Sequence, residues 1–337
     1  MIAARWYGAG DIRIQSVPVP RAGPGDILVR VERVGLCGSD LEEYLDGPVV
    51  ISSGPLTLGH EVLGTVAECP GGELAIGSRV IPDVVVGCGT CWWCRRHEEG
   101  LCPDLVVRGQ QVDGGLAKYM LARAASAVAV PPRSDLDRMA FAEPTSVAIR
   151  AVRKAGDLAG AAACVLGAGT IGNLVCQVLA ASGLRSIVAV EPVGRRRQLA
   201  MELGATATAS PSEAIDVVRR ASDGRMADVV FECTGQSAVA SSALELSRRG
   251  GTVVLVGLRR AMISFPLMSL VLYEKRVFGS AAHLFDEDVA AAVALIANGR
   301  VDPLPLLAAV VPLANVVEEG FKYMGQQCDA LKVLVAP

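Results

Sequence analysis

The chain lacks an excess of charge of either sign. Lysine and arginine number 32 against 35 aspartates and glutamates, which leaves a formal net charge of −3. It also lacks charged tails, internal repeats and low-complexity linkers. Proteins that bind nucleic acid or anionic membranes usually carry a strongly basic surface. We therefore expect neither nucleic acid nor a membrane as a partner.

An export signal is absent as well. The first residues, Met1-Ile-Ala-Ala-Arg-Trp-Tyr, do not show the basic-then-apolar order of a signal peptide. Ten cysteines in a chain without such a signal indicate a reducing compartment, so we expect a cytoplasmic protein. Five of the ten have no ligand-like spacing and are expected to be mostly buried as small hydrophobic residues: Cys69, Cys164, Cys176, Cys233 and Cys328.

The length and texture of the chain predict two domains. Its 337 residues exceed the ~250–300 at which a single core usually stops growing. Up to about residue 145, short β segments such as Ile27–Val34, Val62–Glu68 and Arg79–Val86 are separated by Gly and Pro. From about residue 160, strands and helices alternate, which predicts an α/β domain with a doubly wound parallel sheet.

Six strands and four of the intervening helices can be placed in this second part. The expected strands are Ala163–Leu166, Ser186–Val190, Ala205–Thr208, Val229–Cys233, Thr252–Val256 and Arg276–Gly279. The expected helices are Ile171–Ala181, Arg195–Leu203, Ala214–Ala221 and Ala238–Ser247. The stretch 161–181 is apolar enough to resemble a membrane span, but its three glycines, with Asn173 and Gln177, favour a strand followed by a helix.

Four cysteines within fifteen residues form the pattern C-x2-C-x2-C-x7-C: Cys88, Cys91, Cys94 and Cys102. Such spacing lets one loop bring four thiolates onto a tetrahedron, which predicts a structural zinc site. Gly87 and Gly89 supply the backbone freedom that the loop needs. Disulfides or incidentally buried cysteines are the alternatives.

A glycine-rich turn follows the first strand of the α/β part. Gly167-Ala-Gly-Thr-Ile-Gly172 has the form G-x-G-x-x-G and opens a helix, which is typical of dinucleotide binding. Gly167 would permit the turn, Gly169 would let the pyrophosphate approach the backbone, and Gly172 would allow tight packing of helix on strand. The candidate cofactor-binding residues are Gly167, Gly169, Thr170, Ile171, Gly172, Glu191, Arg196, Thr234 and Gly257.

The choice between NAD and NADP depends on charge near the ribose. Glu191 ends the next strand, nineteen residues beyond Gly172, where a carboxylate would hold the ribose hydroxyls and repel a 2′-phosphate. The arginines at 195–197 could instead pair with that phosphate, or could simply form a solvated helix face. We expect NAD, with NADP as the alternative.

Two further fragments, Gly35-Leu-Cys37-Gly-Ser39-Asp40 and Gly59-His60-Glu61, are unremarkable alone. Together with the cysteine cluster and the glycine-rich turn, they resemble the zinc-dependent medium-chain dehydrogenase/reductase superfamily. The segment Cys37–Pro48 and the fragment Ala142-Glu143-Pro144 are most similar to the 2,3-butanediol and sorbitol dehydrogenases. The resemblance covers nearly the whole chain, and the motifs occur in the family's order.

The resemblance implies a catalytic zinc held by Cys37, His60 and a carboxylate from Glu61 or Glu143. One coordination position would stay open for water or substrate. The two glutamates can exchange with water at this metal in the family, so both remain candidates; an ordinary surface carboxylate is the alternative for Glu143. Asp40 would accept the other ring N–H of His60. With the four-cysteine site, two zinc ions per chain are expected.

The implied reaction is hydride transfer between a secondary alcohol and NAD. Ser39 would take the hydroxyl proton and pass it outward. Relatives usually carry a histidine three residues beyond that serine, but this chain has Glu42. We interpret Glu42 as a sign of a polyhydroxylated or amino-bearing alcohol; a solvent-facing carboxylate without a role is the alternative. His283 lies where it could touch substrate, although a loop histidine is more often structural.

The resemblance also implies a GroES-like β-rich catalytic domain and a Rossmann domain. We expect the first over residues 1–145 and 286–337, with a zinc lobe at 87–103, and the second over 146–285. Relatives pair the last sheet strand across a two-fold axis, so a homodimer or homotetramer is expected. A catalytically silent zinc-binding protein and a thiol redox sensor are the alternative functions, and two zinc ions per chain would favour the enzyme.

Overall fold

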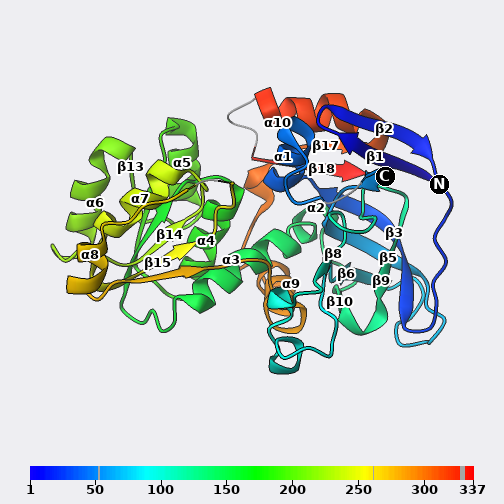
Figure 1. The fold of residues 1–337 in the computed structure, drawn as a ribbon, viewed down its shortest axis with the longest axis horizontal. Coiled ribbons are helices and arrows are strands. Elements are labelled where there is room, and N and C mark those ends of the chain that lie inside the picture. Colours follow the sequence, from blue (N-terminus) through cyan, green and yellow to red (C-terminus); the bar gives the residue numbers. More distant parts are fainter. Residues whose placement is uncertain (52–53, 261, 327–330) are drawn as a thin grey trace. The chain divides into compact units, whose positions relative to one another are not determined.

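The computed structural model describes residues 1–51, 54–260, 262–326 and 331–337. These residues form two compact units (Figure 1). The first unit comprises Met1–Ser146, Ala282–Asn298 and Pro303–Pro337, and the second comprises Val147–Ala281 and Gly299–Asp302. Among the described residues, no helix combines the length and hydrophobicity that a bilayer span requires. Cys328 lies outside the described residues.

The described residues of the first unit form three sheets, two of which build its core. The larger has the strand order β10-β6-β5-β3-β18-β17, with β9 paired to β3, and the smaller has the order β2-β1-β4. The strand bounds are β1 Ile2–Gly8, β2 Asp11–Ser16, β3 Asp26–Gly35, β4 Leu56–Thr57, β5 Glu61–Glu68, β6 Arg79–Pro82, β9 Tyr119–Arg123, β10 Ala127–Ala129, β17 Leu307–Pro312 and β18 Lys332–Ala336. Apolar side chains from both sheets form one core.

The segment expected as one strand over Arg79–Val86 is broken in two. β6 ends at Pro82, and the short strands β7 (Val85–Val86) and β8 (Val106–Val107) pair separately. Asp83 causes the break, because its Oδ1 accepts the backbone N–H of Val85 at 2.9 Å and turns the chain.

Short helices and helical turns complete the first unit. They are α1 Gly38–Asp46, the turns Cys94–Arg96, Glu99–Leu101 and Ala124–Ser126, α2 Leu136–Met139, α3 Ala142–Lys154 (which continues into the second unit), Phe285–Val289, α9 Ala290–Ala297, Leu304–Leu306, Leu313–Asn315, Val316–Lys322 and α10 Tyr323–Gln326. The C-terminal strand β18 joins the sheet antiparallel to β3, as expected for a tail that returns to the first domain.

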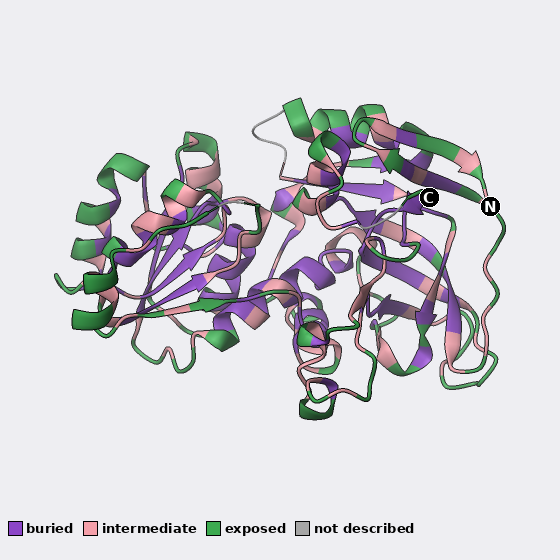
Figure 2. Ribbon diagram, viewed as in Figure 1, coloured by how far each residue is buried: buried purple, intermediate pink, exposed green. Residues whose placement is uncertain are grey.

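The second unit contains the predicted doubly wound sheet. All its strand pairs are parallel, in the order β13-β12-β11-β14-β15-β16. The bounds are β11 Ala162–Leu166, α4 Thr170–Ala181, β12 Ser186–Val190, α5 Gly194–Glu202, β13 Ala207–Ala209, the turn Pro211–Glu213, α6 Ala214–Ala221, β14 Ala227–Glu232, α7 Ser237–Leu246, β15 Ser247–Leu255, α8 Leu267–Leu272 and β16 Arg276–Gly279. The strands are largely buried and the helices half-exposed, as Figure 2 shows.

Two predictions about this unit can be compared with the structure. The stretch 161–181 is the strand β11 followed by the helix α4, as predicted. β15 begins at Ser247, five residues earlier than the sequence indicates, because Ser247 pairs with Ala227 before the register shifts. Gly250 and Gly251 lie within the strand and weaken its sequence signal, and Gly250 has a φ of +68°.

Candidate metal and dinucleotide sites

The structure brings the four clustered cysteines together in the loop between β7 and β8. All four Sγ atoms lie within 4.8 Å of one another. Cys91 Sγ lies 3.5 Å from Cys94 Sγ and 3.8 Å from Cys102 Sγ, and all four thiols are free. A tetrahedron of sulfurs ~2.3 Å from a central zinc has edges of ~3.8 Å. The residues therefore fit a tetrahedral zinc ion.

Backbone N–H groups already point at these sulfurs. Cys88 Sγ accepts the N–H of Cys91 at 3.3 Å, and Cys102 Sγ accepts that of Cys88 at 3.3 Å. Hydrogen bonds from the backbone and hydroxyl of Thr90, with that from Cys91, lower the pKa of Cys88 to about 6. Such donors favour the thiolate, which is the metal-binding form. Gly87 cannot carry a side chain, because a Cβ there would lie 2.7 Å from Cys94 Sγ.

A second group of possible ligands forms around the start of α1. One donor atom each from Cys37, His60 and Glu61 lies within 4.8 Å of the other two. Cys37 is the N-cap of α1, and Glu61 begins β5 directly after His60. Thiolate, imidazole and carboxylate are the donor types that zinc prefers. The set of three fits a catalytic zinc that keeps one coordination position open.

Asp40 links the two ligand-bearing segments. Its Oδ2 accepts the backbone N–H of Cys37 at 3.0 Å, and its Oδ1 lies 3.4 Å from Nδ1 of His60. That Nδ1 is buried and has no hydrogen-bond partner among the described residues. Burial alone would lower the pKa of His60, but the charges of Asp40 and Cys37 raise it well above its ordinary value. A buried imidazole between an acid and a thiol fits a metal ligand whose second ring nitrogen faces a carboxylate.

Glu61 is also held by a lysine that the sequence analysis missed. Lys332, at the start of β18, donates from Nζ to both carboxylate oxygens of Glu61, at 2.6 and 2.7 Å, and to the carbonyl of Leu36 at 3.0 Å. Both charged side chains are buried. A lysine opening the apolar strand Lys332-Val-Leu-Val-Ala was the available signal, since a buried lysine needs an anionic partner.

Glu143, the other candidate ligand, is near His283. Glu143 Oε1 lies 3.4 Å from Nδ1 of His283, whose Nε2 lies 3.1 Å from Asp83 Oδ1. Burial would lower the pKa of His283, but Asp83 and Glu143 raise it to about 10. In the structure Glu143 therefore has an imidazolium partner, whereas Glu61 lies in the group with Cys37 and His60. Asp83 gave no sequence signal beyond following a proline.

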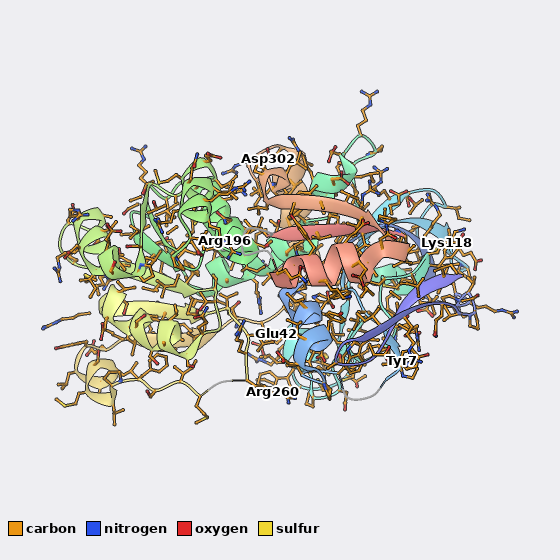
Figure 3. All side chains as sticks on the ribbon, turned by 90° about the horizontal axis from the view of Figure 1, so that it is seen from above. Tyr7, Glu42, Lys118, Arg196, Arg260 and Asp302 are labelled. Atoms are coloured by element: carbon orange, nitrogen blue, oxygen red, sulfur yellow. The ribbon has the colours of Figure 1, made fainter. Side chains whose placement is uncertain are left out.

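Ser39 and Glu42 occupy the helix that begins at Cys37. Both are half-buried and lie three residues apart on α1, so their side chains share one helix face (Figure 3 labels Glu42). This places a hydroxyl and a carboxylate in succession from the Cys37 end of the helix.

The glycine-rich turn has the space that a dinucleotide needs. Gly167 has a φ of +90°, and a Cβ there would lie 2.5 Å from Thr234 Cγ2. A Cβ on Gly172 would lie 1.8 Å from the carbonyl oxygen of Gly167. A Cβ on Gly169, the N-cap of α4, would meet nothing within 4 Å. The first and third glycines are thus required by packing, and the second leaves open space at a helix N-terminus suited to pyrophosphate.

Glu191 is buried beside this turn. Its Oε2 accepts the N–H of Ala168 at 2.9 Å, and its Oε1 accepts the N–H of Val193 at 3.0 Å. Each oxygen keeps lone-pair capacity for a ribose hydroxyl. Arg197 donates to the carbonyl oxygens of Glu191 and Pro192, at 2.7 and 2.8 Å. Arg197 therefore stabilises the loop, while Arg196 is a half-buried residue of the same helix α5 (Figure 3).

Thr234 and Gly257 follow neighbouring parallel strands. The backbone N–H of Thr234 donates to Oε1 of the buried Glu232 at 2.8 Å, and its hydroxyl donates to the same oxygen. A Cβ on Gly257 would lie 2.0 Å from the nitrogen of Gly235, so only glycine fits. Both residues thus lie at the carboxyl edge of the sheet, where doubly wound folds bind their ligands.

Asn173 is a further residue at the turn to which the sequence analysis assigned no role. It is fully buried in α4, and its Nδ2 donates to the carbonyl oxygens of Ala168 and Gly169, at 2.7 and 3.0 Å. An amide within an otherwise apolar stretch was the signal available. Its contacts hold the shape of the glycine-rich turn.

Of the five cysteines expected to be buried, Cys164 and Cys176 are buried, while Cys69 and Cys233 are half-exposed. Burial raises the pKa of Cys164 well above the ordinary thiol value and raises that of Cys176 to about 12. Both are inert core residues.

Comparison with known proteins gives consistent results over the whole chain. Residues 23–132 match the family model "Alcohol dehydrogenase GroES-like domain", and residues 170–298 match "Zinc-binding dehydrogenase". L-idonate 5-dehydrogenase (NAD(P)(+)) of Escherichia coli is 35% identical over 91% of this chain and 90% of its own length. (R,R)-butanediol dehydrogenase of Bacillus subtilis is 32% identical over 100% of both chains. A zinc-binding dehydrogenase structure from Sinorhizobium meliloti bound to NADP superposes with a TM-score of 0.90 at 31% identity, covering 100% of this chain and 99% of that one.

Proposed function

The chain belongs to the zinc-binding alcohol dehydrogenase family, in the butanediol and sorbitol dehydrogenase branch, and we propose that it interconverts a secondary alcohol group of a polyol and the ketone with NAD as the hydride carrier. The observation that carries this proposal is the convergence of Cys37, His60 and Glu61 within 4.8 Å. A silent scaffold of the same fold would have no reason to keep three zinc-type donors together, with His60 and Glu61 buried.

The residues around this group support the chemistry. A zinc ion bound there would act as a Lewis acid on the substrate hydroxyl. Asp40 orients Cys37 and His60 through its two oxygens, and Lys332 neutralises Glu61. Ser39 receives the hydroxyl proton and passes it to Glu42 and the solvent. Glu143 is the alternative carboxylate ligand.

The substrate class rests on Glu42 and on the names of the relatives. The two named above act on idonate and butanediol, compounds with several oxygen-bearing carbons. We propose a polyol or amino-bearing polyol whose further hydroxyl or ammonium groups bind Glu42. Glu42→Gln should lower kcat/KM for such substrates about tenfold while changing it little for a simple secondary alcohol. Equal kinetics across alcohols, polyols and amino alcohols would contradict this role.

The proposed cofactor is NAD rather than NADP. Glu191 is a buried carboxylate beside the turn, and a 2′-phosphate there would face its negative charge. Arg197 is occupied by backbone carbonyls. One relative is named for NAD(P)(+), and one similar structure is bound to NADP. The proposal is therefore tested by measuring kcat/KM with NAD and with NADP, and the value should be higher with NAD.

We also propose a homodimer or homotetramer formed through the edge of the second unit's sheet. β16 is the last strand and pairs only with β15 within the described residues. The helix α8 leads into it and exposes four apolar side chains by 64–73%: Leu267, Met268, Val271 and Leu272. An open strand edge with such a patch favours association with a second copy.

The free thiols of the four-cysteine cluster favour a reducing compartment such as the cytoplasm.

Metal analysis combined with a substrate screen tests the function. The wild-type protein should hold two zinc ions per chain and reduce NAD with diols, polyols, inositols or amino sugars. Cys37→Ser should lose one zinc ion and lower kcat/KM about 10²-fold or more. Cys69→Ser, which alters a half-exposed thiol outside both clusters, should retain both. One zinc ion per chain without NAD reduction by any substrate would instead identify a silent zinc-binding protein.

A further inference from the structure

A pocket of about 490 Å³ opens on the first unit, and no candidate metal ligand lines it. Its walls come from β1, β9 and the segment 108–117. The volume is in the range of pockets that hold small organic ligands. Most of the lining is apolar, with Val17, Val112, Met120 and Leu121 among its members.

The pocket also contains a guanidinium group without a counter-ion. Arg108 lines it, and its Nε is buried without a hydrogen-bond partner. Within the described ranges, no carboxylate lies within ion-pair distance of Arg108. Burial is the main cause that lowers the pKa of Arg108, while Asp26 and Asp83 act on it only from a distance. Arg108 as a whole is half-buried, and a partly desolvated guanidinium without a carboxylate partner favours binding of an anion.

The other charged groups in the pocket restrict the anion. Arg5 is already occupied, because it donates to Asp113 Oδ1 at 2.5 Å, to Thr57 Oγ1 at 3.1 Å and to the carbonyl of Pro55 at 2.5 Å. Asp113 also lines the pocket, and its negative charge disfavours a dianion such as phosphate. Guanidinium binds a carboxylate through two parallel hydrogen bonds, which suits a single planar monoanion.

We propose that this pocket is a binding site for a small monocarboxylate with an apolar body, with Arg108 as the anchor for the carboxylate. The apolar lining contacts the body of the ligand, and the guanidinium donates hydrogen bonds to its carboxylate. The site is separate from the candidate catalytic residues, so the inference does not depend on the proposed activity.

Benzoate is a suitable probe, and benzamide is its neutral analogue of nearly equal shape. Isothermal titration calorimetry of the full-length zinc-loaded protein at constant ionic strength should show benzoate binding at least tenfold tighter than benzamide. Arg108→Gln should weaken benzoate binding at least tenfold and leave benzamide unchanged. Arg13→Gln removes an exposed arginine of β2 that pairs with Asp11 and serves as the matched control, with binding retained.

Two results would overturn the proposal. One is equal affinity for benzoate and benzamide in the wild-type protein. The other is benzoate binding that survives Arg108→Gln, as would happen if the carboxylate bound the catalytic metal. Should Arg108→Gln fail to fold, Arg108→Lys is the second variant, because it keeps the positive charge but loses the planar two-point contact. Arg108→Lys should weaken benzoate binding at least threefold. Unchanged benzoate binding in this variant would contradict the site.

Discussion

At the scale of single residues, the first unit is distinguished by buried charges that have partners. Glu61 pairs with Lys332, Glu143 with His283, and Asp40 lies between Cys37 and His60. An unpaired charge in such a place would cost several kcal/mol. The three carboxylates and the pairing of Asp40 with His60 were recognisable from motifs. Lys332 and His283 were not recognised as partners, because they lie 271 and 140 residues away from Glu61 and Glu143 in the chain.

The prediction at the scale of single residues concerns Asn173 and the binding of NAD. Asn173→Leu removes two hydrogen bonds to the glycine-rich turn but keeps the side-chain volume, so the turn should lose its preformed shape. We expect KM for NAD to rise about tenfold, equivalent to ~1.4 kcal/mol, with kcat within about twofold of the wild type. Steady-state kinetics with NAD varied at saturating alcohol measure both constants.

Gln198→Leu is the matched control, because Gln198 is an exposed residue of the next helix whose Nε2 donates to Glu202 at 3.2 Å. Its KM should not change. A fall in kcat at unchanged KM for Asn173→Leu would show that the residue does not position the cofactor turn.

At the scale of elements, the parallel strands of the second unit are joined at their starts by one carboxylate. Asp228, in β14, accepts the backbone N–H of Ala162 in β11 at 2.8 Å and pairs with Arg248 in β15 at 2.5 Å. Three strands that are distant in sequence thereby share one charged group. The strand pattern predicted a parallel sheet, whereas this link depends on the register of the finished sheet.

The link makes stability depend on pH. Burial would raise the pKa of Asp228, but the Ala162 N–H and Arg248 lower it below its ordinary value of 3.8. A group with a lowered pKa in the folded state stabilises the fold above its ordinary pKa, and this contribution is lost as the pH falls through the folded value. At pH 7, Asp228→Asn should therefore lower the unfolding midpoint by ~2–4 °C, about 1 kcal/mol.

The difference between variant and wild type should shrink as the pH falls below about 4. Thermal unfolding followed by circular dichroism from pH 7 to 3 measures it. Asp216→Asn, on the exposed face of α6, is the control and should match the wild type throughout. A constant difference at all pH values would mean that the charge of Asp228 is unimportant.

At the scale of the whole molecule, the exposed apolar side chains of α8 and the open edge of β16 need an explanation. Leucine, methionine and valine exposed by 64–73% on one short helix exceed what scattered surface residues require. The double change Met268→Glu and Val271→Glu should convert the proposed oligomer into a monomer of 35.0 kDa, because charges there cannot be buried against a second copy.

Size-exclusion chromatography with light scattering measures the mass. Ile76→Glu is the matched control, since Ile76 is 71% exposed but lies in the first unit. It should leave the mass unchanged. An unaltered oligomer in the α8 variant would place the interface elsewhere.

The sequence alone determined the features that depend on adjacent residues: the four-cysteine cluster, the glycine-rich turn and the parallel α/β order. Each follows from local spacing, because a few peptide units limit how far their atoms can separate. The tertiary structure alone decided which charges meet, as in Lys332 with Glu61, 271 residues apart, and His283 with Asp83, 200 apart. These pairs depend on how β18 packs against β3 and where the chain returns to the first unit, and no local pattern contains that register.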